Sequence, residues 1–353
     1  MPPFFRFLIK RIFSFGLSIL IITAVLYGFM MFTSAEERAT LYFPRNIGKM
    51  NEKQMQAMVE RIIKQHHLRD PYPLQCAGWL VSLLRGEWGW SPTLQEDVLS
   101  GLLRRTSATV ELTIYALLFF IPLGLVTGAI SARRRGQSFD IAMRGMAFVA
   151  TSIPSFVVAL LLIAFFYVSL HWFPPERLSS GIAIYVRSNQ FTQFTGLVTL
   201  DGLLNLRPDI TLDALRHLVL PVVALSLVYW ATLSRVTRIT MVEELQKDYI
   251  MAARARGISE RMIVWKHAFR NSLAPTLTFS ALSAASLFTG IFVVERIFSI
   301  RGISDMTMSL SAIADPPVVL GFAIYSLTAV LTIMLVLDIL QAIFDPRVRD
   351  GVL

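Results

Sequence analysis

Three acidic side chains fall within long apolar stretches of this 353-residue sequence: Glu111, Glu295 and Asp338. A carboxylate at membrane depth can bind a coupling ion or relay a proton. All three lie toward the ends of their stretches, where water or another protein can reach them. A series of carboxylates at mid-depth, as a proton-driven pump requires, is absent from the sequence, so we favour other roles over proton transfer.

Motifs for nucleotide hydrolysis or acyl transfer are also absent from the sequence. The only Gly-Lys pair, Gly48-Lys49, is followed by Met50, so it is not the phosphate loop Gly-x-x-x-x-Gly-Lys-Ser/Thr. There is no Gly-x-Ser-x-Gly elbow. Cys76 is the only cysteine, and the five histidines form no His-Glu-x-x-His pattern. We therefore expect no catalytic site, no metal site and no cofactor in this chain.

The composition indicates a membrane protein. Hydrophobic residues make up 54% of the chain and charged residues only 16%, with a mean hydropathy of +0.58. A soluble protein carries about 25% charged residues. The net charge of +9 could indicate nucleic-acid binding. The basic residues, however, form short clusters beside apolar stretches, which is typical of the cytoplasmic side of a membrane protein, so we expect no nucleic-acid partner.

Six apolar stretches are about 20 residues long or longer, enough to cross a bilayer as helices. The first follows basic residues, as in a signal peptide, but it exceeds the roughly 7–15 apolar residues of such a peptide, so we expect it to be retained. The sequence therefore predicts an all-α, polytopic membrane protein with about six transmembrane helices. The predicted spans are 12–33, 109–132, 143–170, 218–239, 275–298 and 318–344.

Clusters of Lys and Arg beside the spans give the orientation. They precede span one, bracket the connection between spans two and three, fill the connection between spans four and five, and follow span six. An even number of spans puts all four clusters on one side, so both termini are predicted to be cytoplasmic. The expected organisation is 1–33 (N-terminus and first span), 34–107 (extracytoplasmic loop), 108–344 (core of five spans) and 345–353 (cytoplasmic tail).

Two long loops are expected outside the cytoplasm, at 34–107 and 171–217. Within the first, apolar residues recur at helical spacing over 51–68. This spacing predicts a short amphipathic helix.

The cytoplasmic loop 241–274 is expected to form two helices. Residues 248–257 favour a helix that Gly257 ends, because glycine tolerates a positive φ. Ser259 is expected to cap a second helix that runs to about Asn271. Ala252 and Ala253 are small, so another protein could approach them closely. From these residues alone, an ordinary basic loop between two spans remains the alternative.

The spacing in this loop resembles the coupling loop of ATP-binding-cassette importer permeases, in particular the dipeptide/oligopeptide (nickel) branch. The matching segments are Asp248-Tyr249, Ala253-Arg254-Ala255-Arg256-Gly257 and His267-Ala268-x-Arg270-Asn271-x-x-x-Pro275. Further similar stretches are Ser152-Ile153-Pro154-Ser155-Phe156 and Val293-Val294-Glu295-x-x-Phe298. The chain departs from the family pattern at Met251, where many members have Glu, and at Arg301-Gly302-Ile303-Ser304, where they have Pro-Gly-Leu-Gly.

The resemblance implies a type I importer permease in a bacterial or archaeal cytoplasmic membrane, with peptides as cargo. Its implied partners are a second homologous permease, two ATP-binding subunits that hold ATP and Mg, an extracytoplasmic solute-binding protein and membrane lipids. Residues implied to couple to the ATP-binding subunits are Asp248, Tyr249, Ala252, Ala253, Arg256, Gly257, His267, Arg270 and Asn271.

Five residues are candidates for the translocation path: Ser152, Pro154, Ser283, Ser286 and Glu295. Pro154 can interrupt a helix where it lines a cavity. Ser283 and Ser286, with Ser280 and Thr289, give the fifth span a stripe of small polar residues, for which ordinary helix packing is the alternative. A self-contained secondary transporter or channel remains a rival class, but it would need ion-coupling residues at mid-depth.

Overall fold

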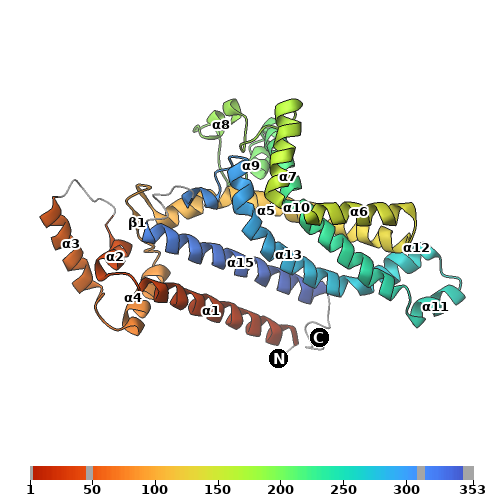
Figure 1. The fold of residues 1–353 in the computed structure, drawn as a ribbon, viewed down its shortest axis with the longest axis horizontal. Coiled ribbons are helices and arrows are strands. Elements are labelled where there is room, and N and C mark those ends of the chain that lie inside the picture. Colours follow the sequence, from red (N-terminus) through yellow and green to blue (C-terminus); the bar gives the residue numbers. More distant parts are fainter. Residues whose placement is uncertain (1–2, 45–50, 308–314, 345–353) are drawn as a thin grey trace. The chain divides into compact units, whose positions relative to one another are not determined.

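The computed structural model describes residues 3–44, 51–307 and 315–344, and nearly all of its elements are helices (Figure 1). Two compact units are present. Among the described residues, the first unit comprises 3–5, 107–301 and 333–344, and the second comprises 6–44, 51–106, 302–307 and 315–332. Three of the four boundaries between them fall inside long helices, so neither unit corresponds to one of the expected segments alone.

Five described helices are long and apolar enough to cross a membrane: α1 (Pro3–Met30), α5 (Val98–Arg133), α10 (Pro208–Glu244), α13 (Phe269–Ile297) and α15 (Pro316–Phe344). A bent pair, α6 (Ser138–Ser152) and α7 (Ser155–Leu162) with its π-helical extension η2 (Ile163–Ser169), makes six if it is counted as one span. The prediction of an all-α polytopic protein with about six spans is confirmed.

The third predicted span, 143–170, is not one straight helix. The chain bends by 101° between α6 and α7, and Figure 1 shows α7 standing steeply to α6. Ile153 is extended, with φ −106° and ψ 124°, and Pro154 begins the next helix. Proline lacks an N–H and disfavours the helical conformation in the residue before it, which explains the break at this position.

Helix α10 is the centre of the first unit, where it packs against α13, α6, α9 (Val198–Leu204) and α7. It is longer than the predicted span 218–239 because Pro208 starts it early, at a position where proline is well tolerated. The expected loop 171–217 therefore contains α8 (Ser180–Val186), α9 and the first turns of α10. The shared core includes Leu112, Phe120, Leu225, Leu233, Leu287 and Ile291.

Helices α5 and α10 approach each other closely at two glycines. A Cβ atom added at Gly128 would lie 2.5 Å from the carbonyl oxygen of Ser234, and one at Gly124 would lie 2.9 Å from the Leu233 side chain. Between them, Thr127 accepts a hydrogen bond from Trp230 Nε1 at 3.1 Å. A Gly-x-x-x-Gly spacing is common where membrane helices pack, because it lets the backbones meet.

In the second unit, most of the predicted extracytoplasmic loop 34–107 is helical. Helix α3 (Glu52–Gln65) confirms the amphipathic helix predicted over 51–68. Asn51 caps it, with Gln54 completing a capping box, and Ile62 and Ile63 are buried. The other elements of this loop are α2 (Ala35–Ala39), η1 (Thr40–Tyr42), α4 (Tyr72–Leu84) and the paired strands β1 (Trp90–Ser91) and β2 (Glu96–Asp97). The second unit also contains η4 (Ile303–Met306).

Replacing Gly128 by alanine should destabilise the protein, although alanine favours a helix by about 1 kcal/mol over glycine. Overpacking of this kind costs about 1–3 kcal/mol, so the thermal unfolding midpoint of the purified chain should fall. Gly145→Ala in α6 is the matched control, because a Cβ there meets no atom within 4 Å. Equal midpoints for the two variants would contradict a close α5–α10 contact.

Candidate functional site

The predicted coupling helix is present as α11 (Asp248–Ala255), one short turn after α10. Its C-terminal end is a Schellman motif: the N–H of Ile258 donates to the carbonyl of Ala253, and that of Gly257 donates to Arg254. Gly257 has φ +75°, which a residue with a Cβ atom rarely adopts. The glycine therefore ends α11 at this position, as the sequence predicts.

The second helix of the loop differs from the prediction. Helix α12 (Glu260–Met262) passes through a π-helical segment, η3 (Ile263–Ala268), directly into α13, and the helix does not stop at Asn271. Pro275 lies inside α13 rather than in its first turn. Ser259 is at the N-cap position, but its side chain makes no capping hydrogen bond. The second helix of the loop and the fifth predicted span therefore form one continuous helix.

One face of α11 is buried against the ends of other helices. Ile250 and Ala253 pack in a cluster with Ala129 and Ala132 of α5, Met241 of α10, and Ile263, Val264 and Ala268 of η3. Ala253 is only 8% exposed, whereas Ala252 is exposed. The structure therefore separates the roles of the two alanines: Ala252 is exposed, and Ala253 lies on the buried face that holds α11 in place.

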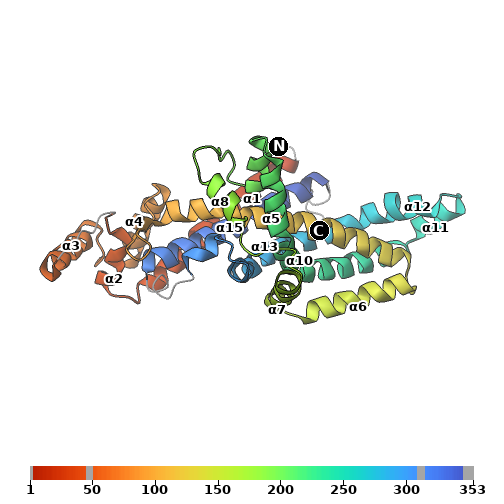
Figure 2. The same ribbon diagram turned by 90° about the horizontal axis from the view of Figure 1, so that it is seen from above.

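The remaining predicted coupling residues are accessible. Figures 1 and 2 show α11 and α12 together at one end of the first unit, beyond the end of α10. His267 is half-buried. The exposed members are Asp248, Tyr249, Arg256, Gly257, Arg270 and Asn271.

A polar clasp joins α11 to α10 and α13. The hydroxyl of Tyr249 donates to Glu244 Oε2 at 2.8 Å and accepts from Asn271 Nδ2 at 3.0 Å. Partial desolvation of the hydroxyl, with its hydrogen bond to Glu244, raises the pKa of Tyr249, so the hydroxyl keeps its proton. The clasp should therefore hold below pH about 10 and weaken only as the pH rises through the raised pKa. Our sequence analysis included Tyr249 and Asn271 but missed Glu244, whose only signal is its place just before the loop.

The candidates for the translocation path are not brought together. Ser152 and Pro154 are exposed at the break between α6 and α7. On α13, Ser283 and Glu295 are buried, and Glu295 accepts a hydrogen bond from Thr109 of α5. Among the candidates on α13, only Ser286 is exposed. The hydrogen bond from Thr109 shows that Glu295 joins α13 to α5, and the buried position of Ser283 agrees with the helix packing that the sequence left open for the serines.

Glu111 is also part of a structural contact. Its two oxygens accept hydrogen bonds from Nε and Nη2 of Arg177, at 2.9 and 2.6 Å, and from the N–H and hydroxyl of Thr199, both at 2.8 Å. Both oxygens of this buried carboxylate are therefore occupied by donors. This arrangement ties α5 to the segment around α9 and favours a structural role over proton transfer.

The fold and this site define a polytopic membrane protein in which α11 and α12 project at one end of the first unit. The chain belongs to the family described as "Binding-protein-dependent transport system inner membrane component", whose model matches residues 121–350. Members of this family are membrane components of transport systems. The chain is therefore a multi-pass transport subunit and not an enzyme.

Curated relatives cover most of the chain. The di/tripeptide transport system permease protein DppB of Pseudomonas aeruginosa is 36% identical over 283 residues, which are 80% of this chain and 82% of the relative. The dipeptide transport system permease protein DppB of Bacillus subtilis is 30% identical over 349 residues, 98% of each chain. The oligopeptide transport system permease protein AppB of the same organism is 31% identical over 85% of this chain and 88% of the relative.

Replacing Tyr249 by phenylalanine removes both hydrogen bonds of the clasp. Each contributes about 0.5–1.5 kcal/mol, so backbone amides of α11 should exchange hydrogen roughly tenfold faster. Hydrogen exchange followed by mass spectrometry measures this directly. Tyr229→Phe is the control, because the Tyr229 hydroxyl has no hydrogen-bond partner among the described residues. Unchanged exchange in Tyr249→Phe would show that the clasp does not hold α11.

Proposed function

We propose that this chain is a permease subunit of an ATP-binding-cassette importer in a bacterial or archaeal cytoplasmic membrane, and that it forms half of a translocation path for di- or oligopeptides. The family match and the names of the relatives support the class and the cargo. The observation that carries the coupling role is α11, a short helix with one buried face and one accessible face.

The connections of α11 suit it to transmit motion. It is anchored through Ile250 and Ala253, through the clasp of Tyr249, and through a continuous helix from α12 into α13. A displacement of α11 would therefore be transmitted to α10 and α13 without passing through a flexible linker. These two spans, which precede and follow the loop, would move together.

The proposed partners are those of an importer of this class. Two ATP-binding subunits, which hold ATP and Mg, dock on the cytoplasmic side, one of them on the outer face of α11. A second, homologous permease completes the path, and a solute-binding protein delivers the cargo from outside. Closure of the ATP-binding subunits moves α11, and the spans then change between inward and outward opening. In this proposal the chain itself needs no cofactor, its other contacts are with lipids, and nucleic acid is not a partner.

For the translocation path, we favour two surfaces. One is the outward face of α13, where the exposed Ser286 and Thr289 lie between the apolar Leu282 and Val293. The other is the break at Pro154, since an interrupted helix is tolerated at membrane depth where it lines a cavity.

The rival class, a self-contained secondary transporter or channel, finds less support. Such a protein needs ionisable groups at mid-depth that change their bonding during transport. Glu111, the best candidate, is buried with both oxygens engaged. Purification distinguishes the two classes, because only an importer permease should bring down ATP-binding subunits and a second permease.

Gly257→Val tests the coupling role. A β-branched residue held at φ +75° costs about 1–3 kcal/mol, so the end of α11 should change conformation. In the reconstituted complex we expect cargo uptake to fall at least tenfold. ATP hydrolysis should continue, but the cargo should no longer stimulate it.

Gly257→Asn is the matched control, because asparagine tolerates the left-handed conformation and a Cβ at this position meets no atom within 4 Å. It should keep most of the uptake. Wild-type uptake and ATPase activity in Gly257→Val would contradict coupling through α11.

A further inference from the structure

A cavity of about 320 Å³ lies between α5, α6 and α10 in the first unit, and neither the coupling site nor the candidate path uses it. Its walls are largely apolar and include Met143, Ala147 and Phe148 of α6. Phe148 is 73% exposed, so the cavity opens where a spanning helix presents a large apolar side chain. These walls suit a hydrocarbon chain.

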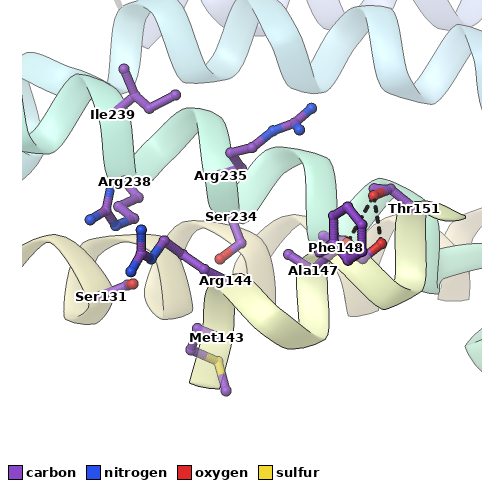
Figure 3. A pocket seen from close by; sticks show the side chains of 11 residues that line it. Ser131, Met143, Arg144, Ala147, Phe148, Thr151, Ser234, Arg235, Arg238 and Ile239 are labelled. Carbon is purple, nitrogen blue, oxygen red and sulfur yellow. Dashed lines mark hydrogen bonds between the residues drawn. The ribbon is translucent and has the colours of Figure 1, made fainter. Parts of the chain in front are cut away.

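Arginines form the rim of the same cavity. Figure 3 shows Arg144 and Arg238 close together above Ser131, with Arg235 further along α10. This is the end of the helices that carries the basic clusters, which places the rim on the cytoplasmic side of the membrane.

The charge of these arginines is only partly balanced. Asp140 binds Arg238 through both oxygens, at 2.5 Å to Nε and 2.8 Å to Nη2, and also accepts from Ser131 and from the N–H of Gly136. The Nε atom of Arg144 is 3.9 Å from the same carboxylate, and its side chain is 56% exposed. Among the described residues, no carboxylate pairs with Arg235. Arg144 and Arg235 are therefore available to bind an anion.

A second cavity, of about 440 Å³, adjoins the first and shares Arg144, Arg238 and Ile239 with it. It is lined by more polar groups, including Arg135 and Glu243. Four arginines and two carboxylates line the two cavities together, so their lining carries a net formal charge of +2. A mainly apolar cavity thus meets a polar, positively charged one at a shared row of arginines.

We infer that this pair of cavities binds an anionic phospholipid of the cytoplasmic leaflet. One acyl chain lies along Met143, Ala147 and Phe148, and the phosphate lies at the rim beside the guanidinium of Arg144, with Arg235 adding positive charge further along α10. Guanidinium groups bind phosphate through paired hydrogen bonds, and basic pockets between membrane helices on the cytoplasmic side are suited to anionic headgroups. A free phosphate would leave the apolar walls unfilled, whereas a zwitterionic lipid would bring a choline cation to a positive rim.

Bound lipid would join α6 to α10 and so stabilise the folded chain. This inference does not depend on the proposed transport function, because it concerns only the cavities and their charges.

The test uses the full chain, purified in detergent and stripped of lipid. Phosphatidylglycerol, phosphatidylcholine or glycerol 3-phosphate is added over a concentration series, and the thermal unfolding midpoint is measured. We expect phosphatidylglycerol to raise the midpoint in a saturable way, because a ligand of the native state stabilises it. The other two should have little effect. Native mass spectrometry of the wild-type chain should show one retained phosphatidylglycerol.

The double variant R144Q/R235Q should bind phosphatidylglycerol at least tenfold more weakly. R133Q/R134Q is the matched control, since it removes the same charge from exposed arginines that line neither cavity. If both variants lost the same affinity for phosphatidylglycerol, the binding would depend only on the overall positive charge of the protein, and the proposed site would be wrong. Equal shifts with phosphatidylcholine would also overturn it, and equal shifts with glycerol 3-phosphate would identify a free-phosphate site instead. A dimeric wild-type chain that retains no lipid would indicate that a second copy covers the cavity.

Discussion

The burial of Ile250 and Ala253 against the ends of α5, α10 and η3 is the contact on which the cytoplasmic side of this protein depends. Fully burying one isoleucine side chain contributes about 1.5–3 kcal/mol, which is enough to fix a helix of eight residues that would not be stable by itself. With this face buried, the opposite face of α11 becomes a surface of defined position. The Tyr249 clasp and the Schellman end at Gly257 then fix its orientation and length.

The membrane-spanning part is built on a different principle. In lipid, apolar side chains gain little by leaving their surroundings, so close packing and hydrogen bonds hold helices together. The glycines at 124 and 128 allow α5 to meet α10 backbone to backbone, and Thr127 bonds to Ser234 and Trp230 across the same contact. Polar residues in the spans that looked like transport residues, such as Glu111 and Glu295, serve a similar purpose.

Much of this architecture could be predicted from the sequence because its signals are local. The length of the apolar stretches predicted the spans, the helical spacing of apolar residues predicted α3, and Gly257 predicted where α11 ends. The partners of Glu111 could not be predicted, because Arg177 and Thr199 are 66 and 88 residues away along the chain. Local propensity also does not fix a bend of 101° at Pro154, the direction in which Ala253 points, or the continuity of the helix through Asn271. Those features depend on tertiary packing.

The docking of α11 on an ATP-binding subunit is tested most directly by cysteine cross-linking in the assembled transporter. Cys76, the only native cysteine, is first replaced by serine. With a short bifunctional reagent, Ala252→Cys should cross-link to an ATP-binding subunit, whereas Ala253→Cys on the packed face should not. Cross-linking that fails at position 252 but occurs from Gln137→Cys, in the exposed turn between α5 and α6, would contradict the assignment of α11 as the docking helix.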